Sequence, residues 1–213
     1  MAGPIVVIDY GMGNLRSVSK AVEHVAGGAE VVVTDDPALI RGADRVVFPG
    51  QGAARDCMAS IGEHHLNQAV REAAASKPFL GICMGMQVLL EHSEENGGTP
   101  LLGLYAGAVR RFPGTAVGPD GVLLKIPQMG WNRVRPVREH PLWEGIEPGA
   151  RFYFVHSYYV DPVDRALVAA TTDYGLDYAS AIARDNVFAV QFHPEKSAQA
   201  GLRLLANFVG WRP

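Results

Sequence analysis

Cys83 lies in a segment where glycines stand two residues before it and two residues after it, at Gly81 and Gly85. A nucleophile elbow has this spacing: a strand ends in a sharp turn that carries the nucleophile, and a helix follows. Residues without a Cβ relieve the backbone crowding in such a turn. We expect the helix to run to about Glu91, and its first N–H groups favour a thiolate. The spacing therefore predicts an activated sulfur, with a buried structural cysteine as the alternative.

A second segment, at residues 191–195, supplies a histidine and a carboxylate directly after an expected strand. A thiol nucleophile needs a base that takes its proton and returns it to a leaving amine. His193 can do this, and Glu195 can fix its tautomer and orientation because Pro194 imposes a fixed local turn. Standing alone, the segment would be better interpreted as a surface turn.

A glycine-rich loop, Pro49-Gly50-Gln51-Gly52, ends another expected strand. Ligands of open α/β sheets bind outside the carboxyl ends of the strands, so this loop and the Cys83 turn are expected to meet. Its backbone N–H groups could form an oxyanion hole for a tetrahedral intermediate, and an ordinary turn is the alternative.

The other chemically active side chains point to no metal site. The seven histidines include the adjacent pair His64-His65, but no helical His-x-x-x-His and no Cys-x-x-Cys spacing occurs. We therefore expect no metal and take Cys57 as structural. The aromatic-rich segment 152–159 carries the pair His156-Ser157, which could bind a small polar substrate or simply belong to a packed strand.

The composition narrows the class of protein that must position these groups. A net charge of −3 and a pI of about 6.1 give no electrostatic case for nucleic acid or an anionic membrane. Two cysteines in 213 residues form no disulfide framework, which indicates a reducing compartment, and we expect a cytoplasmic protein. The first residues carry no basic and apolar signal-peptide pattern, and we expect no membrane span.

The first half of the chain alternates apolar strands with amphipathic helices, which predicts a mostly parallel sheet flanked by helices. The expected strands are Ile5–Ile8, Val31–Val33, Val46–Phe48 and the one before Cys83. The helix faces are marked by Leu15, Val18, Val22 and Val25, and by Leu66, Val70, Ala73 and Ala74.

From Leu101 onward the pattern changes to strands and turns, which predicts a mixed or antiparallel addition to the sheet. The expected strands are about Tyr105–Arg111, Leu123–Ile126, Arg151–Val160, Leu167–Thr172, Ala179–Ala183 and Val187–Gln191, with a loop over Gly114–Gly121 and a closing helix with Leu202, Leu205, Phe208 and Val209 on its apolar face. We expect one α/β domain over residues 1–213.

Six segments together resemble the class I, triad-type glutamine amidotransferases and, within them, the glutaminase subunits of imidazole glycerol phosphate synthase. They are residues 8–15 (IDYGMGNL), 49–52 (PGQG), 81–87 (GICMGMQ), 128–132 (QMGWN), 153–158 (YFVHSY) and 191–197 (QFHPEKS). The cysteine elbow and His-Pro-Glu are shared by the whole class. The first, fourth and fifth segments are specific to the subunit family.

The resemblance implies a role for individual residues. Cys83, His193 and Glu195 would form a catalytic triad. Glutamine would be bound by Gln87, Glu95, His156, Ser157 and Tyr158, with Gly50, Gly52 and Met84 around the oxyanion. Asn14, Met129, Trp131, Asn132 and Lys196 would face a partner subunit. Two departures, Gln128 in place of a frequent histidine and Ala53-Ala54 in place of Ala-Phe, leave the triad untouched.

The implied activity is hydrolysis of glutamine to glutamate and ammonia through a glutamyl thioester, without a cofactor. A (β/α)8 barrel cyclase would form a heterodimer with this chain and use the ammonia to make imidazole glycerol phosphate and aminoimidazole carboxamide ribotide in histidine biosynthesis. Three alternatives stay open: a glutaminase for guanylate, anthranilate or aminobenzoate synthesis, a γ-glutamyl hydrolase, and a non-catalytic scaffold subunit.

Overall fold

Five parallel strands form the centre of the sheet in the computed structural model, which describes residues 3–118 and 121–213. Their order is β2-β1-β3-β4-β14, and their bounds are Val31–Thr34, Ile5–Ile8, Arg45–Gly50, Phe79–Cys83 and Val187–Val190. Every residue of β1, β3, β4 and β14 is buried, as continuous apolar runs in a doubly covered parallel sheet require.

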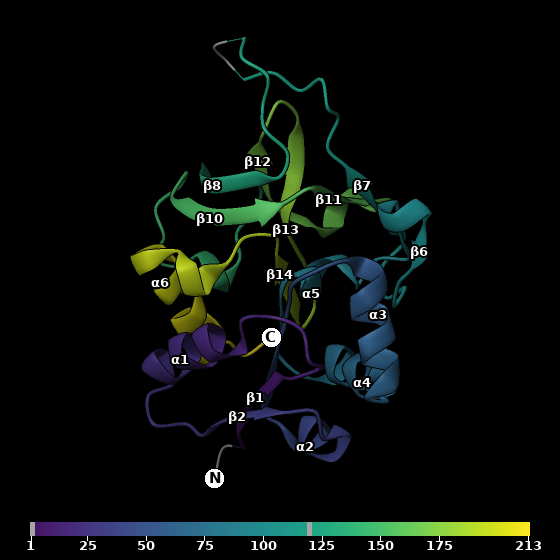
Figure 1. Ribbon diagram of the computed structural model, residues 1–213. Helices are drawn as coiled ribbons and strands as arrows, with labels where there is room; N and C mark the ends of the chain where they lie inside the picture. Colours follow the sequence, from purple (N-terminus) through teal and green to yellow (C-terminus); the bar gives the residue numbers. More distant parts are fainter. Residues whose placement is uncertain (1–2, 119–120) are drawn as a thin grey trace.

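Helices cover both faces of these strands, as Figure 1 shows. α1 (Leu15–Val25) and α6 (Ala198–Gly210) pack together on one face, and α2 (Pro37–Gly42), α3 (Ala54–Glu63) and α4 (Asn67–Ser76) lie on the other. α1 presents Val18 and Val22 to the core at helical spacing. No helix in the described part of the chain is long and apolar enough to cross a bilayer.

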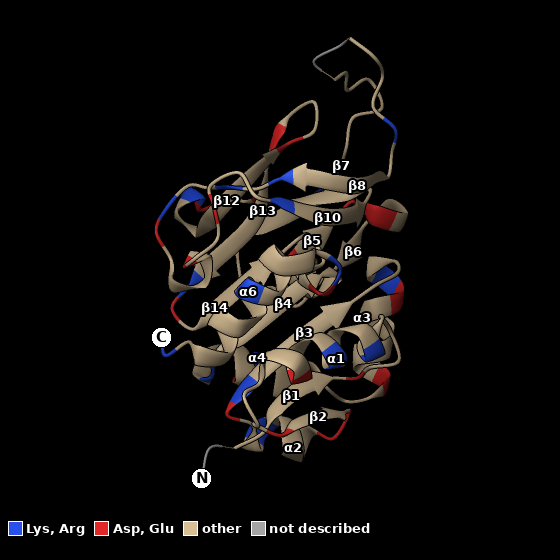
Figure 2. Ribbon diagram, turned by 90° about the vertical axis from the view of Figure 1, so that its left-hand side faces the viewer, with Lys and Arg blue, Asp and Glu red and all other residues tan. Residues whose placement is uncertain are grey.

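Strands of mixed direction, most of them from the second half of the chain, extend the sheet beyond β14, as Figure 2 shows. Three strands continue the sheet in antiparallel pairs: β13 (Asp177–Arg184), β11 (Tyr158–Pro162) and β7 (Gly107–Arg111). β5 (His92–Ser93) then pairs in parallel with β7, and β6 (Thr99–Pro100) pairs antiparallel with β5. β12 (Val168–Asp173) pairs with β13 and with β9 (Arg135–Pro136). The expectation of a mostly parallel α/β domain with a mixed addition is confirmed.

Three expectations for the second half were wrong. The expected strand over 151–160 is two strands, because β10 (Arg151–His156) pairs with β8 (Gln128–Arg133) in a separate sheet while β11 joins the main sheet after Ser157. β8 itself was not among the expected strands. Leu123–Ile126 forms no strand among the described residues, only a single bridge from Leu123 to Val117. The expected loop over 114–121 includes positions 119 and 120, which lie outside the described residues.

The helix after Cys83 is also shorter than expected. α5 covers only Met84–Gln87, instead of running to about Glu91. The carbonyls of the next turn are taken by another segment: Val88 O accepts from Leu102 N at 2.9 Å, and Leu89 O accepts from Leu104 N at 2.9 Å. Since these carbonyls pair with a loop, the chain leaves the helix after one turn.

Candidate active site

Cys83 is the last residue of β4 and occupies a strained turn, with φ 55° and ψ −108°. Residues other than glycine rarely adopt these backbone angles. Such a strained conformation persists where the surrounding packing enforces it. The two neighbouring glycines make that packing possible. A Cβ on Gly85 would stand 1.8 Å from Phe48 O, and a Cβ on Gly81 would stand 2.7 Å from Gly85 O. The elbow predicted from the glycine spacing is therefore confirmed.

The pairing of strands brings His193 to the same edge of the sheet. β14 runs parallel to β4 with Val190 opposite Ile82, so both strands end beside Cys83. After β14 the chain continues to His193, whose backbone N–H donates to Tyr153 O on β10 at 2.8 Å. The carboxyl end of β14 and the strand β10 together fix the position of the imidazole.

Glu195 holds the His193 ring, as the sequence predicted for this pair. Nδ1 of His193 lies 2.9 Å from Oε1 of Glu195, and both side chains are almost fully buried. Nε2 has no hydrogen-bond partner among the described residues, so it is the nitrogen available to Cys83 and to a substrate. Burial disfavours the charged ring, but attraction to Cys83 and to Glu195 outweighs it and raises the pKa of His193 to about 10.

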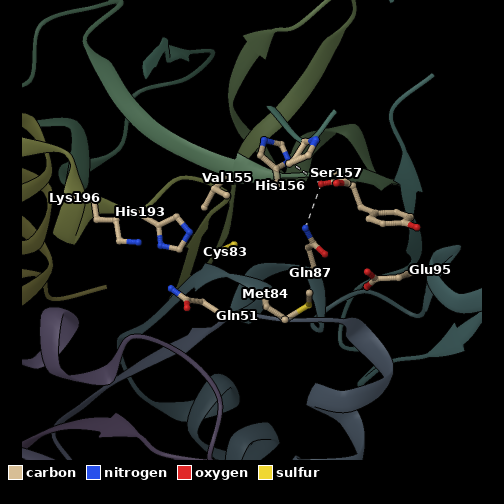
Figure 3. Close-up of a pocket in the computed structure, with 13 residues that line it drawn as sticks. Gln51, Cys83, Met84, Gln87, Glu95, Val155, His156, Ser157, His193 and Lys196 are labelled. Carbon is tan, nitrogen blue, oxygen red and sulfur yellow. Dashed lines mark hydrogen bonds between the residues drawn. The ribbon is translucent and has the colours of Figure 1, made fainter. Parts of the chain in front are cut away.

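Cys83 and His193 open into a cavity of about 430 Å³, drawn in Figure 3. The figure places His193 and Lys196 on one side, Gln87 and Glu95 on the other, and Val155 to Ser157 above the sulfur. The lining residues are Gln51, Gly52, Cys83, Met84, Gln87, Glu95, Pro127, Val155, His156, Ser157, Tyr158, His193 and Lys196. This volume suits a small polar molecule.

The structure brings nearly all the substrate residues expected from the resemblance to this cavity. Gly52, Met84, Gln87, Glu95, His156, Ser157 and Tyr158 all line it. Gly50, at the end of β3, is buried and is not among the lining residues. Tyr10 packs against it, since a Cβ there would stand 2.2 Å from the Tyr10 hydroxyl.

Gln87 and Glu95 offer acceptors at the far side of the cavity from His193. Gln87 is buried, and its Oε1 has no partner among the described residues. Oε2 of Glu95 accepts from the backbone N–H of Ala54 at 2.7 Å. Ala54 is the first residue of α3, whose cap residue Ala53 provides no side-chain bond, so Glu95 satisfies a free N–H of that helix. Glu95 thus ties the cavity to the segment that follows Gly52.

His156 is neutral and belongs to a buried polar cluster. Burial lowers its pKa to about 4. Nδ1 lies 2.7 Å from Tyr158 O, which can only accept, so Nδ1 carries the proton and Nε2 is an acceptor. The Tyr178 hydroxyl, 3.3 Å away, can donate to Nε2, whereas the nearest Gln128 atom, Oε1 at 3.1 Å, is itself an acceptor. The departure at Gln128 therefore falls on a residue that lies against His156.

The residues expected at a partner interface lie outside the cavity, except Lys196. Met129 and Trp131 on β8 are 65% and 49% exposed. Asn132 donates to Asp173 O at 2.8 Å, and Asn14 caps α1. Lys196 Nζ lies 5.8 Å from the ring centroid of Tyr153, which also packs edge-on against Trp131.

The sequence did not single out several residues that the cavity uses. Gln51, Pro127 and Val155 line it, and Gln191 hydrogen-bonds the sulfur of Cys83. Cys57, by contrast, behaves as expected. Its buried thiol donates to Gln51 O at 3.3 Å, and burial raises its pKa to about 11, which leaves it unreactive.

Comparison with protein families and curated sequences gives one consistent result. Residues 6–210 match the family described as glutamine amidotransferase class-I. A protein of Aromatoleum aromaticum named imidazole glycerol phosphate synthase subunit HisH is 61% identical over 210 residues, covering 98% of this chain and 99% of that protein. A protein of Methylococcus capsulatus with the same name is 62% identical over 210 residues, covering 98% and 97%.

Solved structures share the fold at much lower sequence identity. A glutamine amidotransferase crystal structure superposes with a TM-score of 0.70 at 20% identity, covering 97% of this chain and 99% of that one. A structure of PurLQS from Thermotoga maritima gives a TM-score of 0.65 at 19% identity, covering 99% of both chains. At this identity the likeness concerns the fold alone.

Proposed function

Because the chain belongs to the class-I glutamine amidotransferase family and is a glutamine-hydrolysing enzyme, we propose that Cys83, His193 and Glu195 are its catalytic triad. The observation that carries this proposal is the pairing of His193 Nδ1 with Glu195 at 2.9 Å, which leaves Nε2 without a hydrogen-bond partner among the described residues, in the residue that lines the cavity with Cys83. The strained backbone at Cys83 supports it, since strain of this kind accompanies nucleophile elbows.

In the first step the Cys83 thiolate attacks the side-chain amide carbon of glutamine. The carbonyl oxygen becomes an oxyanion, and in this proposal the backbone N–H groups of Gly52 and Met84, which both line the cavity, stabilise it. Collapse of this intermediate breaks the C–N bond. His193, with a pKa of about 10, carries the proton that the departing ammonia requires. A glutamyl thioester on Cys83 remains.

In the second step water hydrolyses the thioester. His193, now neutral, takes a proton from the water, and the hydroxide attacks the thioester carbon. The C–S bond breaks, glutamate leaves, and the sulfur returns as a thiolate beside a protonated imidazole. Glu195 keeps Nδ1 protonated throughout, so Nε2 alone exchanges protons.

The far side of the cavity fits the amino-acid end of glutamine. Gln87 lines the cavity with a buried Oε1 that has no partner among the described residues, and Glu95 adds a carboxylate that attracts an ammonium group. Ser157, Tyr158 and the neutral His156 also line this cavity. A substrate with an amide near Cys83 and an α-amino group near Glu95 has the polarity of this cavity.

The chain acts, in this proposal, as the glutaminase subunit of imidazole glycerol phosphate synthase in cytoplasmic histidine biosynthesis. The support is the identity of 61% and 62%, over nearly full length, to proteins named as that subunit. Its partner is a (β/α)8 barrel cyclase that receives the ammonia in a heterodimer. The exposed Met129 and Trp131 on β8, beside Asn14, Asn132 and Lys196, form the docking face. Residues 1–213 act as one amidotransferase domain.

Ammonia and glutamate release test this assignment. Glutamine is supplied to the purified chain alone, and then with a histidine-pathway cyclase barrel and its ribotide substrate. We expect little turnover alone, a large increase in the mixture, and none with Cys83→Ala. Strong turnover that the barrel leaves unchanged would indicate an independent hydrolase or another pathway, and no turnover in either sample would indicate a scaffold subunit.

A further inference from the structure

A chain of hydrogen bonds runs from the far side of the cavity to the nucleophile. Gln87 Nε2 lies 3.0 Å from Gln191 Oε1, and Gln191 Nε2 lies 3.7 Å from the sulfur of Cys83. Gln191 is fully buried, and neither the sequence motifs nor the triad chemistry gives it a role. Because this buried amide contacts the reacting sulfur, we expect it to have a role in the reaction.

The register of the sheet puts Gln191 in this place. β14 pairs in parallel with β4 so that Val190 stands opposite Ile82. The next residues, Gln191 and Cys83, therefore lie side by side where both strands end. The backbone N–H of Gln191 donates to Ser180 O on β13 at 2.9 Å, which anchors the residue from the other side.

The neighbouring groups fix which way round the Gln191 amide lies. Gln87 Nε2 also lies 3.2 Å from the backbone carbonyl of Tyr158, and a carbonyl can only accept. The amide nitrogen of Gln87 must therefore face Tyr158 O, and it faces Gln191 as well. The Gln191 atom that meets this donor has to be the acceptor Oε1, so Nε2 of Gln191 is the group that faces the sulfur.

The same orientation leaves Oε1 of Gln87 as the end of the network. That atom is buried and has no partner among the described residues. A donor arriving there polarises the Gln87 amide, whose N–H groups then donate more strongly to Gln191, and Gln191 in turn to the sulfur. The direction of donation along the network is therefore from a bound ligand to the nucleophile.

We propose that Gln191 activates Cys83 by donating a hydrogen bond to its sulfur and couples this bond, through Gln87, to occupation of the glutamine site. A donor to sulfur favours the thiolate over the thiol, because charge-assisted hydrogen bonds are stronger than neutral ones. This inference rests on the proposed function, which makes Cys83 the nucleophile. It adds to the three residues of the triad a fourth residue, Gln191, which contacts the reacting sulfur.

The test compares two substitutions of Gln191 with a matched surface substitution. Gln191→Met keeps the unbranched shape and removes the donor, and Gln191→Glu keeps the acceptor for Gln87 but turns an oxygen toward the sulfur. Gln199→Met, on an exposed position of α6, is the control. Iodoacetamide labelling of the Cys83 peptide is followed by mass spectrometry across pH, with and without glutamate in the site. Thermal unfolding of each variant is measured alongside.

We expect Gln191→Met to slow labelling near neutral pH by about 10-fold or more, the order of effect of a hydrogen bond to a charged group. Its pH midpoint moves upward, and glutamate no longer changes the rate. Gln191→Glu labels more slowly still, because its carboxylate repels a thiolate. In glutamine hydrolysis kcat falls about as much as the labelling rate, while KM changes less. Gln199→Met matches the wild type.

Labelling of Gln191→Met within about twofold of the wild type, with an unchanged pH midpoint, would overturn the inference. If the methionine variant does not fold, Gln191→Glu decides alone, and wild-type labelling in that variant would overturn it equally. Failure of the proposed function looks different. The wild-type Cys83 would then label no faster than an ordinary thiol, and Cys83→Ala would keep its glutaminase activity.

Discussion

The charge on His193 is the property of a single residue on which the proposed chemistry depends most. The ring is buried, which opposes the charge, and Cys83 and Glu195 reverse that preference until the pKa reaches about 10. A protonated imidazole at neutral pH is ready to donate to departing ammonia. The same group loses this ability as the pH rises through its pKa.

Glu195→Gln tests that dependence. Without the carboxylate the pKa of His193 falls, so the ring loses its proton at a lower pH and the alkaline limb of the kcat profile moves toward neutrality. We expect kcat to fall roughly 100-fold, less than in Cys83→Ala, because a glutamine side chain still orients the ring in part. Ammonia release measured from acid to alkaline pH gives both kcat and the pH of the alkaline limb. An alkaline limb at its original position would contradict the role given to Glu195.

Single residues could be predicted from the sequence where a motif isolates them. Cys83 and His193 stood out because glycine spacing and a proline-fixed turn mark them. Gln191 did not stand out, because an amide has no distinctive chemistry and its contact with the sulfur follows from strand register. Gln51 and Val155 line the cavity for a similar reason: their position depends on which strand ends meet.

Among the elements, the turn between β4 and α5 is the one whose geometry the site depends on. Gly85 packs its backbone directly on β3, where a Cβ would stand 1.8 Å from Phe48 O. Backbone atoms cannot move aside as the end of a flexible side chain can. The elbow is therefore intolerant of even a methyl group.

Gly85→Ala should destabilise the protein by about 3 kcal/mol or more, since it forces a clash with a central strand. Gly42→Ala is the matched control, because nothing lies within 4 Å of the added Cβ at the end of α2. We expect that variant to be neutral or about 0.5–1 kcal/mol more stable. Urea unfolding of the two proteins provides the comparison, and equal stabilities would contradict the packing described for the elbow.

Elements were predictable where local pattern and tertiary structure agree. β1 shows its whole extent as an apolar run because it is buried on both faces. The segment 151–160 reads as one strand, yet it divides at Ser157 because its two halves pair with β8 and with β7 and β13. α5 ends after one turn because a distant loop takes the next carbonyls. Neither choice of partner is visible in a local pattern.

At the scale of the whole molecule, β8 and α2 each expose large apolar side chains at opposite ends of the structure (Figure 1). Trp131 and Met129 lie on β8, whereas Leu39, 46% exposed, lies on α2 beside the edge strand β2. A large exposed aromatic beside a catalytic cavity is typical of a binding surface. The exposed tryptophan distinguishes the proposed docking face from the other large exposed apolar residues of the described chain, which are aliphatic.

Trp131→Ala should weaken binding of the barrel cyclase by about 2 kcal/mol, roughly 30-fold in Kd, as expected for a central aromatic residue of an interface. Because Trp131 is 49% exposed, the variant should unfold near the wild-type temperature. Leu39→Ala is the control and should bind the cyclase normally. Calorimetric titration gives the affinities, and equal binding by both variants would place the partner on another face.

The covalent state of Cys83 during turnover tests the central claim most directly. The chain, together with the proposed cyclase partner, is mixed with glutamine, quenched in acid and mapped by mass spectrometry. We predict a glutamyl group on the Cys83 peptide that is absent from Cys83→Ala and from samples without glutamine. Continued release of glutamate with no such adduct, or with an unchanged rate in Cys83→Ala, would contradict a mechanism that proceeds through this sulfur.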